Sequence, residues 1–295
     1  MKKQHKTVSL VLGSGGARGL AHIGIIKVLE EKGYQIKSIA GSSIGALVGG
    51  IYAAGRMDEY EEWVLGLSRF DIVNMMDIAW DGGGLVKGDR IIRKMVNLVG
   101  DSQIEDLSIR FTAVATDLSS GREVWISKGS LFDAIRSSIS LPLFFTPVKR
   151  RKDLLIDGGV LNPVPIAPTF DDDTDLTIAV NLGGKPTRKP VISHDDEDPP
   201  TDDSDAGGKS DRGETWTHRL KEFFSFQSRA DIGAYDVAYQ AFDAMQSTIA
   251  RQKLAAYPPD LVIEIPRDAC GTFDVHRAAE MIELGRKAAE AALED

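Results

Sequence analysis

Two glycine-rich turns near the start of the chain constrain the fold more than any other sequence feature. Thr7–Leu12 is a short, β-rich apolar run, and the glycine-rich segment Gly13–Gly19 follows it directly. A second short run, Ser38–Ala40, leads into the turn Gly41–Gly45 and then into the small and apolar residues of Ile44–Ala54. Repeated succession of strand, glycine turn and helix is typical of an α/β sheet with parallel strands. We therefore expect an α/β fold.

The rest of the chain continues this alternation. Residues 57–100 have a mainly helical pattern, interrupted by a glycine-rich turn at Asp81–Gly84. Later strands are expected at Phe111–Thr116, Glu123–Ser127, Leu154–Ile156, Leu176–Leu182 and Leu261–Ile265, and later helices at Leu131–Ser137, Glu214–Ala256 and Val275–Leu293. The first two of these strands are expected to form a hairpin across Ser119–Gly121.

Residues 185–213 differ in composition from everything around them. Pro, Gly, Asp, Ser and Lys dominate there, and apolar residues are almost absent. Such a segment cannot bury enough apolar surface to offset the entropy of ordering it. We expect a disordered, acidic insertion at about 185–213 within a single domain that spans residues 7–295.

Overall charge and cysteine content exclude several classes of protein. The net charge is −9, which disfavours nucleic-acid partners. The chain has one cysteine, Cys270, so it contains neither a disulfide framework nor a thiolate metal site. The apolar run Val8–Leu12 is too short for a signal-peptide core, and the longest apolar stretch, Ile39–Ala54, is too short to span a bilayer. We expect a cytoplasmic protein, with peripheral contact at the inner face of the membrane left open.

The segment Gly41-Ser42-Ser43-Ile44-Gly45 matches the G-x-S-x-G pattern of a nucleophile elbow. A nucleophilic serine must project from a tight turn between a strand and a helix, and larger side chains at Gly41 and Gly45 would clash there. Such a serine also lies at a helix N-terminus, where the dipole favours developing negative charge. The motif alone equally fits an ordinary turn in which Ser42 or Ser43 caps the helix.

The first glycine loop, Gly13–Gly19, permits several interpretations. Its successive N–H groups could converge on a dinucleotide phosphate or on the oxyanion of an acyl-transfer intermediate. The dinucleotide fingerprint G-x-G-x-x-G fails, because starting from Gly13 its sixth position is Arg18. A tight turn without a ligand remains the third alternative. Arg18 inside the loop indicates an anchored anion site or a buried ion pair.

A base for Ser43 is harder to find among the five histidines. His5 lies in the N-terminal tail, His194 in the insertion, and His22, His218 and His276 on helical segments. His276 is the best of these as a triad member, although none follows a strand. A desolvated carboxylate can act as the base directly.

Two aspartates follow strand-like runs. Asp157-Gly158-Gly159 comes after Leu154–Ile156, and Asp117 comes after Phe111–Thr116. Either residue, taken alone, also fits an Asx-turn.

Together these elements resemble the patatin-like phospholipase family, specifically its bacterial branch related to the neuropathy-target-esterase group. The glycine loop, the G-x-S-x-G turn and Asp-Gly-Gly occur in that family's order. Further similarity lies in Gly15–Gly24 (GGARGLAHIG), in Ala134–Phe144 (AIRSSISLPLF) and in the Gly-bearing hairpin of Phe111–Gly129. The similarity covers roughly residues 7–183.

The resemblance implies a three-layer α/β/α sandwich with a mainly parallel central sheet. It also implies a Ser-Asp dyad, with Ser43 as nucleophile and Asp157 as base. The loop around Gly15, Gly16 and Arg18 would supply oxyanion-hole N–H groups, and no metal or cofactor is expected. Ser14 stands where the family commonly has glycine, so we expect a changed entry to the loop.

The expected activity is hydrolysis of fatty-acyl esters of phospholipids or lysophospholipids. An esterase or thioesterase acting on soluble acyl substrates, and a non-catalytic nucleotide- or regulator-binding module, remain alternatives. Ile139–Val148 would line an acyl channel or form a buried core strand. The basic run Lys149–Lys152 would steer an anionic headgroup or form a solvated turn. The partner is a lipid or fatty-acyl ester, and the sequence does not determine the oligomeric state.

Overall fold

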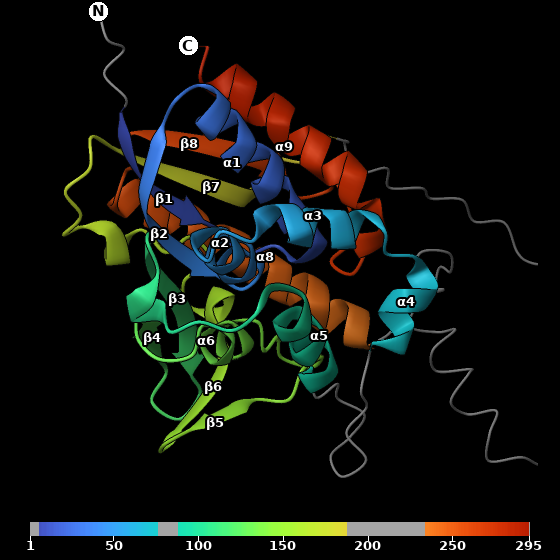
Figure 1. Ribbon diagram of the computed structural model, residues 1–295. Coiled ribbons are helices and arrows are strands. Elements are labelled where there is room, and N and C mark those ends of the chain that lie inside the picture. The colour runs from blue at the N-terminus through green and yellow to red at the C-terminus, as the bar shows by residue number, and fades with distance from the viewer. Residues whose placement is uncertain (1–5, 76–87, 188–233, 295) are drawn as a thin grey trace, which may run out of the picture. The chain divides into compact units, whose positions relative to one another are not determined.

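The computed structural model describes residues 6–75, 88–187 and 234–294 (Figure 1). Contacts between residues divide the chain into two units, one formed by residues 1–188 and 244–295 and the other by residues 189–243. Of the second unit the structure describes residues 234–243, which begin a helix. The expected turn at Asp81–Gly84 and all of the expected insertion beyond residue 187 lie outside the described residues.

A single mixed sheet forms the centre of the first unit. Its strands are β1 (Thr7–Leu12), β2 (Gln35–Ser42), β3 (Arg110–Asp117), β4 (Arg122–Ile126), β5 (Val148–Arg150), β6 (Asp153–Asp157), β7 (Leu176–Gly184) and β8 (Leu261–Pro266). The order is β5-β6-β3-β2-β1-β7-β8, with β4 paired to β3. The pairs among β3, β2, β1, β7 and β8 are parallel, whereas β4, β6 and β5 join in antiparallel fashion. The sheet is thus mainly parallel, as expected, and the predicted β3–β4 hairpin is confirmed.

Strands β2 and β6 share one edge of β3. In β3, Val114 pairs with Ser42 of β2 and also with Trp125 of β4. The next residue, Ala115, pairs with Asp157 of β6 and again with β4. A strand has two edges, and β4 occupies one of them along this stretch, so β2 and β6 must follow one another along the other. The end of β2 therefore meets the end of β6.

The helices cover both faces of the sheet. They are α1 (Ala21–Glu31), α2 (Ile44–Ala53), α3 (Met57–Leu65), α4 (Arg69–Asn74), α5 (Asp89–Val99), α6 (Leu131–Ser138), α8 (Ala234–Ala256) and α9 (Ala278–Ala292). Short 3-10 helices are η1 (Gly16–Leu20), η2 (Ile104–Asp106), η3 (Gly158–Val160), η4 (Ala167–Thr169) and η5 (Val275–Arg277). Helices α1 and α9 lie side by side in Figure 1 and pack against each other.

Alternation along β1 separates two cores. Successive side chains of a strand point to opposite faces of its sheet. Leu10 and Leu12 belong to the larger apolar cluster, which includes side chains of α1, α2, α6 and α9. Val11 belongs to a smaller cluster with Ala179 of β7 and Ala250 of α8. Helices therefore lie on both sides of the sheet, and the expected α/β/α arrangement is confirmed.

Most expected elements are present, with shifted bounds. The helical stretch predicted over residues 57–100 is three helices, α3, α4 and α5, in its described part. The last helix, predicted from residue 275, begins with the 3-10 turn η5 before α9. Of the helix predicted over residues 214–256, the structure describes α8. In the described part of the chain, no helix combines the length and the apolar composition that crossing a bilayer requires.

Candidate active site

Ser43 lies in a sharp turn between β2 and α2. Its backbone has φ 56° and ψ −123°, a conformation that non-glycine residues rarely adopt and that is common at functional sites. A Cβ atom added to Gly45 would lie 2.1 Å from the carbonyl oxygen of Leu12, and one added to Gly41 would lie 2.5 Å from the main-chain nitrogen of Ala46. Because the backbone passes so close to both positions, only glycine, which has no Cβ atom, fits there. The turn has the strand–turn–helix setting of a nucleophile elbow.

The Ser43 hydroxyl donates a hydrogen bond to the carboxylate of Asp157, with 2.5 Å between Ser43 Oγ and Asp157 Oδ2. The two residues are 114 positions apart in the chain. The shared edge of β3 brings them together, because Ser42 pairs with Val114 and Asp157 pairs with the following residue, Ala115. The structure thus joins the serine and the aspartate that the sequence singled out.

Asp157 is fully buried at the end of β6. Its other carboxylate oxygen accepts a hydrogen bond of 2.7 Å from the Gly159 N–H, and its own N–H donates to the carbonyl of Ser140. Gly158 and Gly159 begin the 3-10 helix η3, which Asp157 caps. Burial raises the pKa of Asp157 to about 7, against the opposing effect of the Ser43 and Gly159 hydrogen bonds.

A buried serine that sequence reasoning gave no role holds the nucleophile turn in place. The Ser43 N–H donates to Ser138 Oγ at 2.9 Å, and the Ser138 hydroxyl donates to the Val114 carbonyl at 2.6 Å. Ser138 is the last residue of α6, so this helix is tied to both the nucleophile turn and β3. The serine-rich block around it supported the family resemblance, but its pattern does not indicate which hydroxyl faces Ser43.

The first glycine loop lies beside Ser43. Gly16 and Ala17 line the same pocket as Ser43. The N–H of Ala17 donates to the Thr272 carbonyl, whereas Gly16 is the first residue of η1, and an N–H at that position has no partner within its helix. The Gly16 N–H thus lacks an intrahelical partner in a residue that lines the pocket of Ser43. Gly15 precedes it as the N-cap of η1.

Arg18 supports the main chain around this loop. Its side chain is 4% exposed, and it donates to the Gly15 carbonyl at 2.9 Å and to the Arg267 carbonyl at 2.6 Å. These bonds fix the loop against the segment that follows β8. The N–H of Ser14, the residue that departs from the family pattern, donates to the Pro163 carbonyl.

The other side chains considered as a base for Ser43 make hydrogen bonds elsewhere. His22 is buried, with Nε2 3.0 Å from the Gly13 carbonyl oxygen, and burial lowers its pKa to about 4. His276, the best triad candidate by sequence, accepts a hydrogen bond from Arg69. Asp117 accepts hydrogen bonds from Ser120, from the Ser119 N–H and from the Leu154 N–H of β6, and these bonds hold the pKa of Asp117 below its usual range. His5, His194 and His218 lie outside the described residues.

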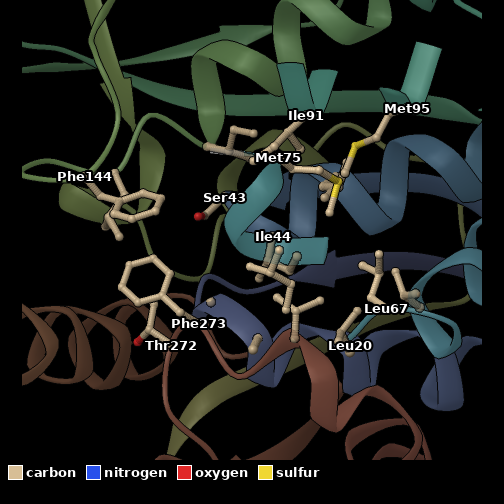
Figure 2. A pocket seen from close by; sticks show the side chains of 18 of the residues that line it. Leu20, Ser43, Ile44, Leu67, Met75, Ile91, Met95, Phe144, Thr272 and Phe273 are labelled. Atoms are coloured by element: carbon tan, nitrogen blue, oxygen red, sulfur yellow. The ribbon is translucent and has the colours of Figure 1, made fainter. Parts of the chain in front are cut away.

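Ser43 opens into an apolar pocket of about 170 Å³ (Figure 2). Ile139, Leu141 and Phe144, from the segment Ile139–Val148, line it. The alternative of a core strand over residues 139–148 is wrong, because the segment is loop and turn as far as residue 147, apart from a single bridge residue at Phe145. Of the basic run, Lys149 and Arg150 lie in β5 and the next two residues form its turn into β6.

The described residues contain no group of three or more His, Cys, Asp or Glu side chains arranged to hold a metal ion. Instead, the site combines a strained serine, a buried carboxylate hydrogen-bonded to it, main-chain N–H groups and an apolar pocket. In such an arrangement a serine hydroxyl can attack an acyl group while the buried carboxylate accepts its proton.

Comparison with known proteins assigns the family. Residues 10–170 match the model of the patatin-like phospholipase family. The chain belongs to this family, and it is a hydrolase.

Among the relatives, an uncharacterized NTE family protein of Mycobacterium tuberculosis (strain H37Rv) is 37% identical over 97% of this chain and 91% of its own length. Lysophospholipase NTE1 of Coccidioides immitis is 28% identical over 96% of this chain, which spans 17% of that protein. A lysophospholipase of Emericella nidulans is 33% identical over 60% of this chain and 12% of its own length. The structure of VipD from Legionella pneumophila aligns with a TM-score of 0.46 at 13% identity, over 99% of this chain and 67% of that one. That similarity is too weak to support an argument about function.

Proposed function

We propose that this hydrolase cleaves fatty-acyl esters of phospholipids or lysophospholipids through a dyad of Ser43 and Asp157. The observation that carries the proposal is the 2.5 Å hydrogen bond between Ser43 Oγ and Asp157 Oδ2 at the edge of an apolar pocket. A hydroxyl that donates to a buried carboxylate is poised to lose its proton as it attacks.

The reaction takes two acyl-transfer steps. Asp157 accepts the Ser43 proton while Ser43 Oγ bonds to the ester carbonyl carbon. The resulting oxyanion lies near the N–H groups of the Gly15–Gly16 loop, and each such donor is worth about 3 kcal/mol. The intermediate then expels the alcohol, which takes the proton from Asp157, and leaves an acyl-serine. Water loses a proton to Asp157 as its oxygen bonds to the carbonyl carbon of this ester. The bond to Ser43 Oγ then breaks, Asp157 returns the proton to Ser43 Oγ, and the fatty acid is released.

The environment of Asp157 suits this role. An exposed aspartate is too weak a base to take a proton from a hydroxyl, and burial raises the pKa of Asp157 to about 7. Near neutral pH a large fraction of the carboxylate is therefore ionised and also strongly basic. The dipole of α2, whose N-terminus begins at Ser43, favours the negative charge that develops on the substrate oxygen.

The choice of a lipid substrate rests on the pocket and the relatives. The pocket next to Ser43 is lined almost entirely by apolar side chains, and burial of an acyl chain there contributes about 0.8 kcal/mol per methylene group. The relatives from Coccidioides immitis and Emericella nidulans carry the name lysophospholipase. A small, polar ester would gain little from such a pocket.

Labelling with a fluorophosphonate probe tests the proposal. The wild-type chain should be labelled at Ser43 and should release fatty acid from lysophosphatidylcholine. Ser43→Ala should abolish both, and Asp157→Asn should reduce turnover by roughly a thousandfold or more while the fold is retained. Asp117→Asn is the matched control, because Asp117 also ends a strand but its carboxylate bonds to its own turn and to the Leu154 N–H rather than to Ser43. Equal labelling of the wild type and Ser43→Ala would rule out the dyad.

A further inference from the structure

Aromatic rings line one end of the apolar pocket. Phe144 packs against Phe145 with 4.6 Å between ring centroids and against Phe273 with 4.3 Å between ring centroids. In Figure 2, Phe144 and Phe273 lie on one side of the Ser43 hydroxyl, whereas Leu67, Met75 and Met95 lie on the other. Because the rings are packed against one another, an acyl chain bound at Ser43 is directed toward α3 and α5.

At the other end of the pocket, three side chains line both this pocket and a second space. Trp63 at the end of α3, Leu67 just after it and Met75 after α4 line the apolar pocket. The same side chains also line a second cavity of about 680 Å³, which is more open to solvent and whose described lining comes from α3, α4, α5 and the residues next to them. Trp63, Leu67 and Met75, which we call the partition, therefore separate the two spaces.

The space beyond the partition has a different chemical character. Its lining includes charged side chains from all of these helices, namely Glu62, Asp71, Arg90, Arg93 and Lys94. The aliphatic end of an acyl chain gains free energy only where it leaves water for an apolar environment. A methylene group pushed past the partition would enter a polar cavity and gain little. Among the described residues, the apolar lining available to a fatty acyl chain thus ends at the partition.

The volume on the near side of the partition sets the length of that chain. An apolar cavity of about 150 Å³ in a protein accommodates benzene, which has six carbons. The pocket at Ser43 is about 170 Å³, which corresponds to roughly six to eight carbons of an acyl chain.

Building on the dyad proposed above, we infer that this enzyme selects short and medium acyl chains of roughly six to eight carbons, with the chain end stopped by the partition of Trp63, Leu67 and Met75. Each methylene group up to that length raises kcat/KM roughly fourfold. Longer chains must displace the partition or fold back, which lowers kcat/KM roughly tenfold or more.

The test is a chain-length profile on p-nitrophenyl acyl esters from two to sixteen carbons, kept below their micelle-forming concentrations. For the wild type, kcat/KM should peak at roughly six to eight carbons. Leu67→Ala enlarges the pocket and should shift the peak to longer esters, by roughly two carbons. Leu67→Phe fills it and should shift the peak to shorter esters. Opposite shifts from one position are not expected from a loss of stability.

Leu65→Ala is the matched control, since Leu65 is the last residue of α3 and is 49% exposed. It should leave the peak unchanged. A profile that rises steadily to sixteen carbons, or Leu67 variants with the wild-type profile, would overturn the inference. Fluorophosphonate labelling of Ser43 is scored in parallel. Labelling with a flat or rising profile rejects the length limit alone, whereas no labelling and no turnover rejects the dyad, and the inference with it.

Discussion

Replacing Asp157 with asparagine should stabilise the folded chain at alkaline pH relative to acidic pH, even though it removes the proposed base. Burial raises the pKa of Asp157 to about 7 in the folded chain, from 3.8 for an exposed aspartate. The folded chain therefore binds this proton more tightly than the unfolded chain does. The stability that this group contributes is fully present below pH 3.8 and is lost as the pH rises through 7.

The size of the effect follows from these two pKa values. Proton linkage with pKa 3.8 unfolded and about 7 folded gives a loss of about 2.5 kcal/mol in the unfolding free energy between pH 5 and pH 8. Asparagine does not titrate, so Asp157→Asn escapes this loss. The difference in unfolding free energy between variant and wild type should therefore move by about 2.5 kcal/mol in favour of the variant across that interval.

Urea unfolding followed by circular dichroism at several pH values between 5 and 8 measures this difference. Taking variant minus wild type cancels the titration of all other groups that the substitution leaves unperturbed. Asp117→Asn is the control, because hydrogen bonds lower the pKa of Asp117. The Asp117 carboxylate is ionised in both the folded and the unfolded chain throughout this pH range. The difference in unfolding free energy between Asp117→Asn and the wild type should therefore stay constant.

A constant difference for Asp157→Asn would refute the reasoning. It would mean that the carboxylate has an ordinary pKa in the folded chain and is therefore too weak a base for the proposed reaction. A change of opposite sign, with the variant losing stability toward pH 8, would mean that the ionised carboxylate is stabilised by its neighbours rather than destabilised by burial.

Three further predictions concern the same site. The kcat/KM for a short ester should rise tenfold per pH unit below about pH 7 and level off above it, because Asp157 must be ionised to accept the proton; a flat pH–rate profile would contradict this. Ser138→Ala removes the hydrogen-bond partner of the Ser43 N–H. The rate of probe labelling at Ser43 should fall roughly tenfold to a hundredfold, and the unfolding free energy should fall by about 1–3 kcal/mol. An unchanged labelling rate would show that this bond does not position Ser43. Gly45→Ala places a Cβ atom 2.1 Å from a carbonyl oxygen and should lower the melting temperature and abolish labelling, whereas Gly66→Ala, whose added Cβ would meet nothing closer than 3.6 Å, should change neither.

The local structure around the nucleophile could be predicted from the sequence. A turn flanked by Gly41 and Gly45 between an apolar run and a small-residue helix depends on contacts close along the chain, and the structure has that turn. The strands around it were also predictable, because their apolar residues are consecutive. The first and last residues of each strand were less predictable. β2, for example, begins at Gln35 rather than Ser38, because pairing of Gln35 and Ile36 with β1 extends it.

The pairing of the two site residues could be anticipated through the family resemblance, but the residue pattern alone left Asp117 and Asp157 as rivals. Both aspartates end a strand, and they differ in which part of the sheet lies next to that strand end. Asp117 turns back on Ser120, whereas Asp157 ends a strand that meets β2 along β3. Strand order and register depend on contacts distant in the chain, which a local pattern does not record.

The sequence by itself therefore determined the class of fold, the position of the serine turn and the family. Tertiary structure decided that Asp157 reaches Ser43, that its carboxylate is desolvated, that Ser138 bonds the Ser43 N–H, and that Trp63, Leu67 and Met75 line the pocket at Ser43. The physical reason is that turns and strand propensities act over a few residues. Desolvation and cavity volume are instead sums over all the atoms that packing brings around a point in space.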